Sequence, residues 1–265
     1  MSADADLRLL VDAAAEAGRI ALRYFRMDPH VWWKEGNSPV SEADLAVDTF
    51  LKETLLAARP DYGWLSEETV AEAPAAGAPE RFFVVDPIDG TRSFLRGEET
   101  WCVALAVVAG GRPVAGAIDV PVREEVFEAA AGEGARLNGL PLDAGERVDA
   151  DEELRVAMPD ALRRKLSPDM LRNVRAAVSA PSLAYRIAQV AAGRLDGTLI
   201  RPSASDWDIA AADLILAEAG GLLGDIEGEE RLYKIEGRRH GLLIAGTKAA
   251  WPELRRIARS ATAAA

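Results

Sequence analysis

The chain has little of what several common kinds of protein require. Its 265 residues include one cysteine, Cys102, which excludes an internal disulfide framework and, within an apolar run, predicts core packing. The two histidines, His30 and His240, do not stand near a serine or cysteine nucleophile motif, which argues against a histidine-based triad. Both histidines are therefore expected at the surface. Apolar runs as long as a membrane span are also missing, so no spanning segment is expected.

Positive charge is scarce as well. The 31 lysines and arginines face 43 aspartates and glutamates, which gives a net charge of −12 and argues against a general nucleic-acid or membrane-surface binder. Residues 1–6 are acidic where a secretory signal would be basic, which predicts a cytoplasmic protein. If so acidic a protein binds phosphate, it needs a metal ion to invert the local field.

The residues that are present predict alternating helices and strands. Apolar positions at helical spacing predict helices over residues 4–26 and from Ser41 onward, and residues 101–131 fit an antiparallel meander of three strands. The second half is predicted to contain strands at 154–158, 176–179, 195–200 and 242–245, and helices at 161–173, 182–192, 206–219 and 248–263. This alternation is typical of an α/β fold in which helices cover the sheets.

The strongest chemical signal lies at residues 84–91, which read VVDPIDGT. The apolar residues 82–85 predict a buried strand that delivers Asp86 and Asp89 into a tight turn. Carboxylates suit a hard cation such as Mg²⁺, and free N–H groups at Gly90–Thr91 could hold phosphate beside it. Two aspartates in a loop are also ordinary turn chemistry, so this stretch alone does not decide between the two interpretations.

Two further motifs accompany this stretch. Ser-Glu-Glu stands upstream at residues 66–68, and Trp-Asp-Ile-Ala stands downstream at residues 207–210. In this order the three motifs resemble the inositol monophosphatase superfamily of metal-dependent phosphatases, and the resemblance extends over residues 38–221. It implies a layered αβαβα sandwich with the metal site between its two halves. It also implies a homodimer and inhibition by lithium.

The resemblance also implies a set of metal ligands. Glu67, Asp86 and the carbonyl of Ile88 would hold one Mg²⁺ ion. Asp86 would bridge to a second ion that is also held by Asp89 and Asp208. A third, weaker Mg²⁺ would lie near Glu67, which the resemblance counts among the catalytic residues as well.

Catalytic roles follow from the same resemblance. Gly90 and Thr91 would donate N–H groups to the phosphate, and Thr91 with Asp44 would orient the attacking water. Asp44 has a structural interpretation too, because Ser41 and Asp44 fit a capping box at a helix start, and both roles can coexist. Lys34 is expected outside the ligand set, as a partner of the site.

Asp208, rather than Asp206, aligns with the family's metal ligand, and Asp206 fits better as the helix N-cap. Asp208 would belong to a C-terminal α/β domain, residues 151–265, that also supplies substrate contacts. Most ligands would lie in an N-terminal α+β domain, residues 1–150, with the boundary in the acidic stretch at 148–153. Residues 70–80, rich in alanine, proline and glycine, are expected to act as a lid.

Substrate choice is less determined. Inositol monophosphatases commonly place a glutamate seven residues before the metal aspartate, and here that position is Arg201. A guanidinium suits a second phosphate or a carboxylate better than a polyol, although a plain surface charge is the alternative. Residues 38–44 look more like the corresponding segment of the 3′(2′),5′-bisphosphate nucleotidases. The motif at residues 86–91 departs from those enzymes, because it has isoleucine where they usually have leucine. Residues 89–94 are similar to the histidinol-phosphate branch.

The sequence therefore predicts a Mg²⁺-dependent phosphomonoesterase. Its substrate would be a small phosphorylated metabolite, either inositol 1-phosphate or a 3′(2′),5′-bisphosphate nucleotide. A histidinol-phosphate phosphatase is an alternative, and so is a non-catalytic regulatory binding protein on the same fold. The retained acidic ligands count against the second alternative, because a scaffold has no need of four carboxylates around one pocket.

Overall fold

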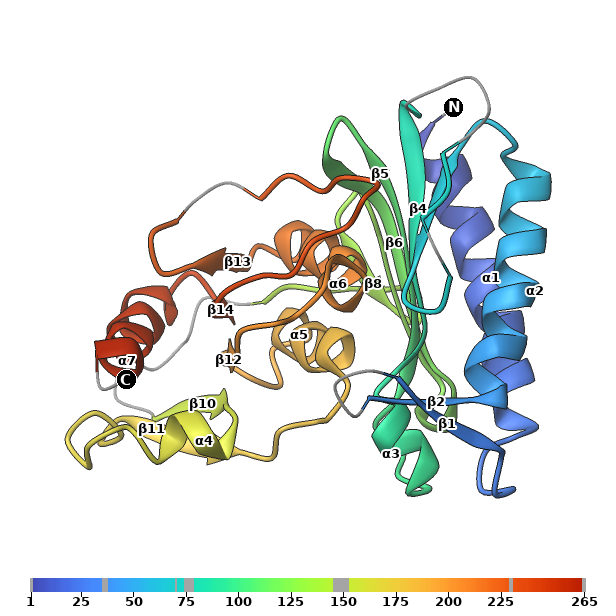
Figure 1. Ribbon diagram of the computed structural model, residues 1–265. Coiled ribbons are helices and arrows are strands. Elements are labelled where there is room, and N and C mark those ends of the chain that lie inside the picture. The colour runs from blue at the N-terminus through green and yellow to red at the C-terminus, as the bar shows by residue number, and fades with distance from the viewer. Residues whose placement is uncertain are drawn as a thin grey trace.

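The computed structural model describes residues 2–34, 38–69, 71–73, 79–144, 153–228 and 231–263. Its elements form alternating layers of helix and sheet (Figure 1). In order, the layers are α1 (Ala3–Leu22) with α2 (Glu42–Ala58), a seven-stranded sheet, α5 (Leu183–Ala191) with α6 (Asp206–Glu218), a five-stranded sheet, and α7 (Trp251–Ala263). The αβαβα sandwich expected from the sequence is confirmed.

The seven-stranded sheet carries the predicted meander. Its strands, in spatial order, are β3 (Gly63–Ser66), β4 (Arg81–Asp89), β5 (Cys102–Ala109), β6 (Arg112–Val120), β7 (Glu125–Ala130), β8 (Ala135–Leu137) and β9 (Leu140–Pro141). β3 and β4 pair in parallel, and the later neighbours pair antiparallel. The meander and the strand before Asp86 are confirmed, and so is the burial of Cys102. The sequence does not predict the short β8 and β9.

The five-stranded sheet has the order β11-β10-β12-β14-β13. Its strands are β10 (Leu154–Ala157), β11 (Val174–Ala177), β12 (Gly197–Ile200), β13 (Leu222–Asp225) and β14 (Leu243–Gly246). The predicted helix at 161–173 is wrong, because only the short α4 (Asp160–Arg163) forms and turns follow it. Pro168 explains the difference, since a proline disfavours helix at the residue before it and has no N–H to continue one.

Shorter elements lie at the bottom of Figure 1, where each connects neighbouring helices or strands of one layer. They are the hairpin of β1 (Val31–Lys34) and β2 (Ser38–Ser41), the helix α3 (Thr91–Leu95) and a 3₁₀ turn at Pro121–Arg123. Ser41 ends the hairpin and caps α2 in the predicted capping box. The predicted domain boundary at 148–153 lies almost wholly outside the described residues. No described helix has the length and apolar character needed to cross a membrane.

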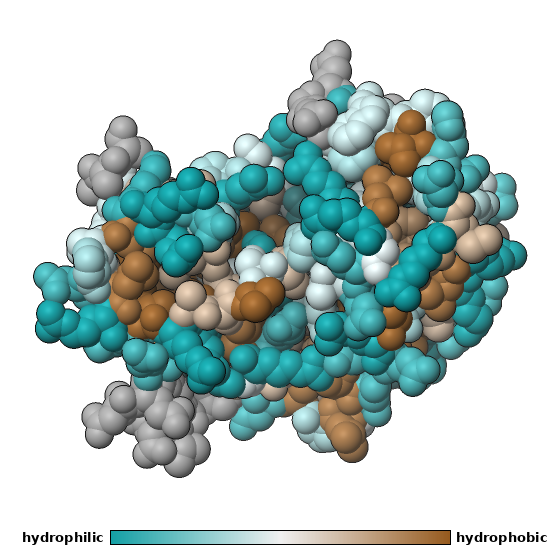
Figure 2. Space-filling view, turned by 90° about the horizontal axis from the view of Figure 1, so that it is seen from below, coloured by the Kyte–Doolittle hydropathy of each residue, from teal (hydrophilic) through white to brown (hydrophobic). Residues whose placement is uncertain are grey.

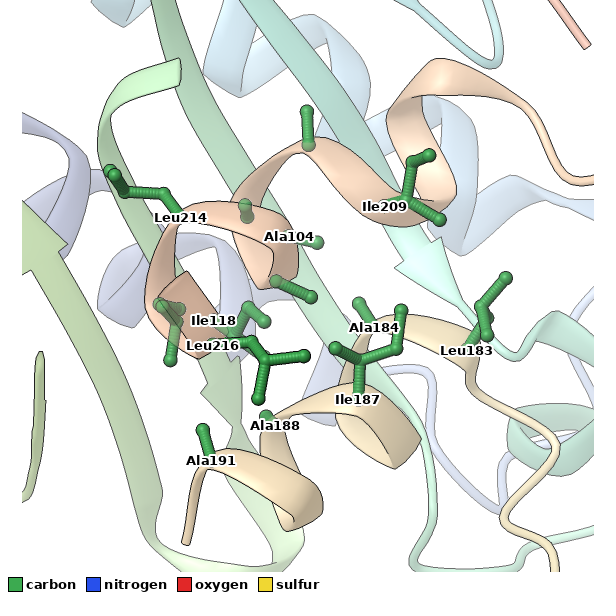
Figure 3. Packing of buried hydrophobic residues seen from close by; sticks show 14 of the residues in the cluster. Ala104, Ile118, Leu183, Ala184, Ile187, Ala188, Ala191, Ile209, Leu214 and Leu216 are labelled. Carbon is green, nitrogen blue, oxygen red and sulfur yellow. The ribbon is translucent and has the colours of Figure 1, made fainter. Parts of the chain in front are cut away.

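Three apolar cores hold the layers together. One lies under α1 and α2, one between the large sheet and the α5 and α6 pair, and one under α7. Figure 3 shows the middle core, where Ile187 of α5 and Leu216 of α6 approach Ile118 of β6. Gly116 of β6 lets α6 come close, because a Cβ there would lie 3.0 Å from the carbonyl oxygen of Ala211.

A buried carboxylate ties the outer helices to the large sheet. Asp6 of α1 is fully buried and accepts hydrogen bonds from Arg59 Nε at 3.0 Å, Arg81 Nη1 at 2.7 Å and the Tyr62 hydroxyl at 3.0 Å. Arg59 follows α2, and Arg81 begins β4. Asp6 therefore joins α1 to α2 and to the strand that leads to residues 86–91.

We expect Asp6→Ala to lower the free energy of unfolding by about 3–5 kcal/mol, because it leaves two partly buried guanidinium groups without their carboxylate. Urea denaturation measures the change. Asp4→Ala is the matched control on the same helix, since Asp4 pairs with Arg8 at the surface and should contribute less than about 1 kcal/mol. Equal losses in the two variants would contradict this role of Asp6.

Candidate active site

The end of β4 is irregular, and this irregularity presents the acidic residues. The pairing of β4 with β5 shifts register between Asp86 and Asp89, so both carboxylates leave the regular strand pattern within four residues. Gly90 follows with φ of +92° and is the N-cap of α3, which begins at Thr91. A Cβ at Gly90 would lie 3.1 Å from Cβ of Ser182, so a left-handed backbone and a close neighbour both require glycine here.

Three carboxylates meet beside this end of β4. Asp86, Asp89 and Asp208 each offer an oxygen, and these oxygens lie within 4.8 Å of one another. Asp208 belongs to the first turn of α6, where the Ser205 N–H donates to its Oδ2 at 2.6 Å. The structure thus brings together three of the ligands expected from the sequence, two from the large sheet and one from α6.

Asp206 is not the helix N-cap that the sequence suggests. Ser205 is the N-cap, and Asp206 is the first residue of α6. The Asp206 carboxylate is buried and accepts from the backbone N–H of Arg238 at 3.1 Å and lies 2.7 Å from His240 Nε2. The prediction that His240 lies at the surface is therefore wrong, whereas His30 is exposed as expected.

Negative charge in this cluster lacks compensation. Burial raises the pKa of Asp86 well above its ordinary value, and the charges of Glu67, Asp89 and Asp208 raise it further. Burial also raises the pKa of Asp89 to about 6 and that of Asp208 to about 8. Asp86 Oδ1 is buried and has no hydrogen-bond partner among the described residues. A group of oxygen donors with excess negative charge and an unpaired oxygen fits a hard divalent cation.

Asp89 is fixed by groups that the sequence does not predict for this site. The Ser182 hydroxyl donates to Asp89 Oδ2 at 2.7 Å, and the Ala184 N–H donates to the same oxygen at 2.6 Å. Cys102 Sγ lies 3.9 Å from it. Ser182 is the N-cap of α5, at the predicted helix start. A capping pattern in the sequence does not predict a hydrogen bond to Asp89, which lies 93 residues away.

Asp44 and Thr91 are in contact. The Asp44 Oδ2 atom accepts from the Ser41 N–H at 2.8 Å and from the Ser41 hydroxyl at 2.5 Å, as in a capping box. Its Oδ1 atom lies 3.2 Å from Thr91 Oγ1, which also lies 3.1 Å from the carbonyl oxygen of Ile88. Burial raises the pKa of Asp44 to about 6. The same carboxylate therefore has both contacts considered from the sequence, one to the helix start and one to Thr91.

Glu67 lies at the edge of the site. It is not in the group of three carboxylates within 4.8 Å, which was sought among the described residues. Lys34 Nζ lies 3.4 Å from Glu67 Oε1 and 2.6 Å from Glu68 Oε1. Burial raises the pKa of the Glu68 carboxyl to about 7 despite this ammonium. Lys34 thus contacts the site as expected, whereas the partly buried Glu68 is not singled out by the sequence.

The remaining predicted features lie around this cluster. Arg201 follows β12 and is exposed. Most of the predicted lid lies outside the described residues, which include residues 71–73, 79 and 80 of it. The face where β4 ends is seen from below in Figure 2, where hydrophilic side chains cover most of the surface and hydrophobic ones form separate patches.

A model of the inositol monophosphatase family matches residues 3–262. The chain belongs to this family. An inositol-1-monophosphatase of Mesorhizobium japonicum is 34% identical over 257 residues, with 94% of each chain covered. A histidinol-phosphatase of Chlorobaculum parvum is 32% identical over 239 residues, with 88% of this chain and 90% of its own covered.

Comparison with a solved structure supports the same family assignment. The extragenic suppressor protein SuhB of Bartonella henselae superimposes with a TM-score of 0.83 at 29% identity, over 96% of this chain and 98% of its own. The recognition made from the three motifs is therefore confirmed. As a member of the inositol monophosphatase family, the chain is a phosphoric monoester hydrolase, and its acidic cluster could bind metal.

We expect the metal-free protein to lose stability as the pH rises from about 4, the ordinary pKa of an aspartate, to about 8. A carboxyl whose pKa is raised by folding stabilises the folded state while it is protonated, and this stabilisation is lost as the pH passes the folded pKa, about 8 for Asp208. Asp208→Asn mimics the neutral form and should keep the hydrogen bond from Ser205. Its melting temperature in EDTA should match the wild type at about pH 3, below the unfolded pKa, and exceed it by several degrees at about pH 8. A constant difference across this range would contradict the raised pKa.

Proposed function

We propose that this protein hydrolyses a small phosphomonoester by Mg²⁺-dependent attack of water. One observation carries the proposal: three clustered carboxylates, one with a buried unpaired oxygen, lie next to a contact between Thr91 and Asp44. A protein that merely bound a cation would not need the contact between Thr91 and Asp44. The proposal places the reaction in the cytoplasm.

The carboxylates of Asp86, Asp89 and Asp208 would hold the cations, with Glu67 and the Ile88 carbonyl completing the set. Two or three Mg²⁺ ions fit this number of oxygen donors. When bound, such ions lower the pKa of water, neutralise the phosphate and stabilise the leaving alkoxide. Ser182 and Ser205 orient Asp89 and Asp208 for this purpose, since each donates a hydrogen bond to one carboxylate oxygen.

Thr91 and Asp44 would position the attacking water and accept its proton. Asp44 Oδ2 is occupied by Ser41, so Oδ1 is the atom that faces the threonine hydroxyl. As the water attacks, its proton passes to Thr91 Oγ1 while the hydroxyl proton of Thr91 passes to Asp44. A carboxyl with a pKa of about 6 is suited to this transfer near neutral pH.

The turn at Gly90 and Thr91 would bind the phosphate. The first N–H groups of a helix have no acceptor within the helix, and Gly90 and Thr91 begin α3 beside the carboxylate cluster. The left-handed Gly90 carries no side chain that would block an approaching phosphate oxygen. These backbone donors add no negative charge, which matters in a site that already contains several carboxylates.

Inositol 1-phosphate and a 3′(2′),5′-bisphosphate nucleotide are the proposed substrates. Histidinol phosphate is a second candidate, because the relative from Chlorobaculum parvum is named a histidinol-phosphatase. The experiment that separates them is phosphate release from all three compounds with Mg²⁺, in the presence and absence of Li⁺. Absence of release from all of them, with Mg²⁺ present, would instead favour a non-catalytic binding protein.

We expect Asp86→Asn to lose phosphate release by at least about 100-fold, because even residues that only orient metal ligands contribute about 10–100-fold. Titration calorimetry should show weaker Mg²⁺ binding in the same variant. Asp119→Asn is the matched control, since Asp119 is a buried carboxylate on β6 outside the three-carboxylate group. If Asp86→Asn binds Mg²⁺ as the wild type does, Asp86 is not a ligand.

We expect Thr91→Val to lower kcat by about 10²–10⁴-fold with little change in Mg²⁺ affinity, because valine keeps the shape but lacks the hydroxyl that relays the proton. Thr91→Ser restores a hydroxyl and should recover most of the rate. Steady-state phosphate release and Mg²⁺ calorimetry measure the two quantities. Wild-type turnover by the valine variant would remove Thr91 from the proton path.

A further inference from the structure

Asp206 and His240 form a buried pair just outside the carboxylate cluster. Asp206 is fully buried, His240 is 8% exposed, and Asp206 Oδ1 lies 2.7 Å from His240 Nε2. A carboxylate accepts hydrogen bonds, so Nε2 is the donor in this contact. Asp206 is the first residue of α6 and Asp208 is the third. Because successive residues of a helix are turned by about 100°, the two carboxylates leave α6 on nearly opposite sides.

Backbone hydrogen bonds hold the segment before α6 against the segment before β14. The Asp206 N–H donates to the Arg238 carbonyl oxygen at 3.1 Å, and the Arg238 N–H donates to Asp206 Oδ2 at 3.1 Å. The His240 N–H donates to the Ala204 carbonyl oxygen at 2.7 Å, and the His240 carbonyl oxygen accepts from the Ser203 N–H at 2.8 Å. The two segments thus lie antiparallel, and the Asp206–His240 pair joins them through side chains.

This contact surrounds the residue that orients Asp208. Ser205 stands between Ala204 and Asp206, which both take part in the contact, and its N–H donates to Asp208 Oδ2 at 2.6 Å. The position of that N–H therefore depends on the backbone on either side of it. A side chain at a functional site must be held to within about 0.5 Å of its working position by such supporting contacts.

We propose that the Asp206–His240 pair positions Asp208 as a metal ligand, by fixing the Ser205 N–H that orients it. The inference rests on the proposed function in one respect, the role of Asp208 as a ligand of Mg²⁺. The pair acts through Ser205 and does not touch the cation, so Asp206 and His240 are positioning residues. They should control the affinity for Mg²⁺ rather than the chemical step, because a displaced carboxylate holds the cation less well.

The test measures Mg²⁺ binding by titration calorimetry in the absence of substrate. We expect His240→Leu to weaken this binding by about 10-fold, as for partners that orient metal ligands. His240→Gln should recover most of the affinity, because its amide N–H can take the place of Nε2 and donate to Asp206. His240→Asn has an amide too short to reach Asp206, so it should bind Mg²⁺ as weakly as His240→Leu and replaces that variant if leucine prevents folding.

A matched control separates positioning from a general loosening of α6. Tyr233 is buried and donates to Asp213 Oδ2 of α6 at 2.7 Å, so Tyr233→Phe also removes a buried hydrogen bond between α6 and the segment before β14. Both Tyr233→Phe and His240→Leu should lower the melting temperature in EDTA, but only His240→Leu should weaken Mg²⁺ binding. A long-range effect of charge is excluded as well, because His240→Leu leaves the carboxylate of Asp206 in place to attract a cation.

Kinetics gives a second readout. His240→Leu should require about 10-fold more Mg²⁺ for half-maximal phosphate release, in line with its weaker binding. Its rate at saturating Mg²⁺ should stay near that of the wild type, since enough Mg²⁺ fills the weakened site.

Three results would overturn the inference: wild-type affinity for Mg²⁺ in His240→Leu and His240→Asn, an equal loss in His240→Gln, or an equal loss in Tyr233→Phe. If the wild type binds Mg²⁺ but releases no phosphate from any substrate, the proposed function is wrong and calorimetry still decides the role of the pair. If the wild type binds no Mg²⁺, Asp208 is not a ligand and the inference is wrong with it.

Discussion

Uncompensated negative charge between the two sheets is the constraint on which the rest of the structure depends. Asp86, Asp89 and Asp208 bring oxygens within 4.8 Å of one another where little water reaches, and like charges repel strongly there. Directed hydrogen bonds keep them in place, from Ser182 to Asp89 and from Ser205 to Asp208. The positions of those donors in turn depend on α5 and α6, which pack against the large sheet through the middle apolar core. The packing energy of the core thus offsets the repulsion between three carboxylates that would otherwise move apart.

The sequence predicts the parts of this site that a local pattern encodes. The strand before Asp86, the glycine turn after Asp89 and the capping box at Ser41 each follow from residues within a few positions of one another. Asp208 is predictable because its motif includes the helix that carries it. The alternation of elements likewise suffices for the α/β class, whereas the αβαβα layers were expected from the resemblance to the family.

Contacts between distant segments could not be predicted from the sequence. His240 has no partner nearby in the chain, and the structure pairs it with Asp206, 34 residues away. Ser182 has a local role as a helix cap, which conceals its bond to Asp89 across 93 residues. The error at residues 161–173 has a different origin, because the prediction of a helix there did not take Pro168 into account. Side chains there still cover the third core, from turns rather than from a helix.

The net charge of −12 makes the proposed site selective. A phosphomonoester is an anion, so the acidic protein repels it over most of the surface. A cation held by Asp86, Asp89 and Asp208 would reverse that repulsion at this one place. The carboxylates that repel one another in the metal-free protein would therefore be the reason that phosphate binds there and not elsewhere.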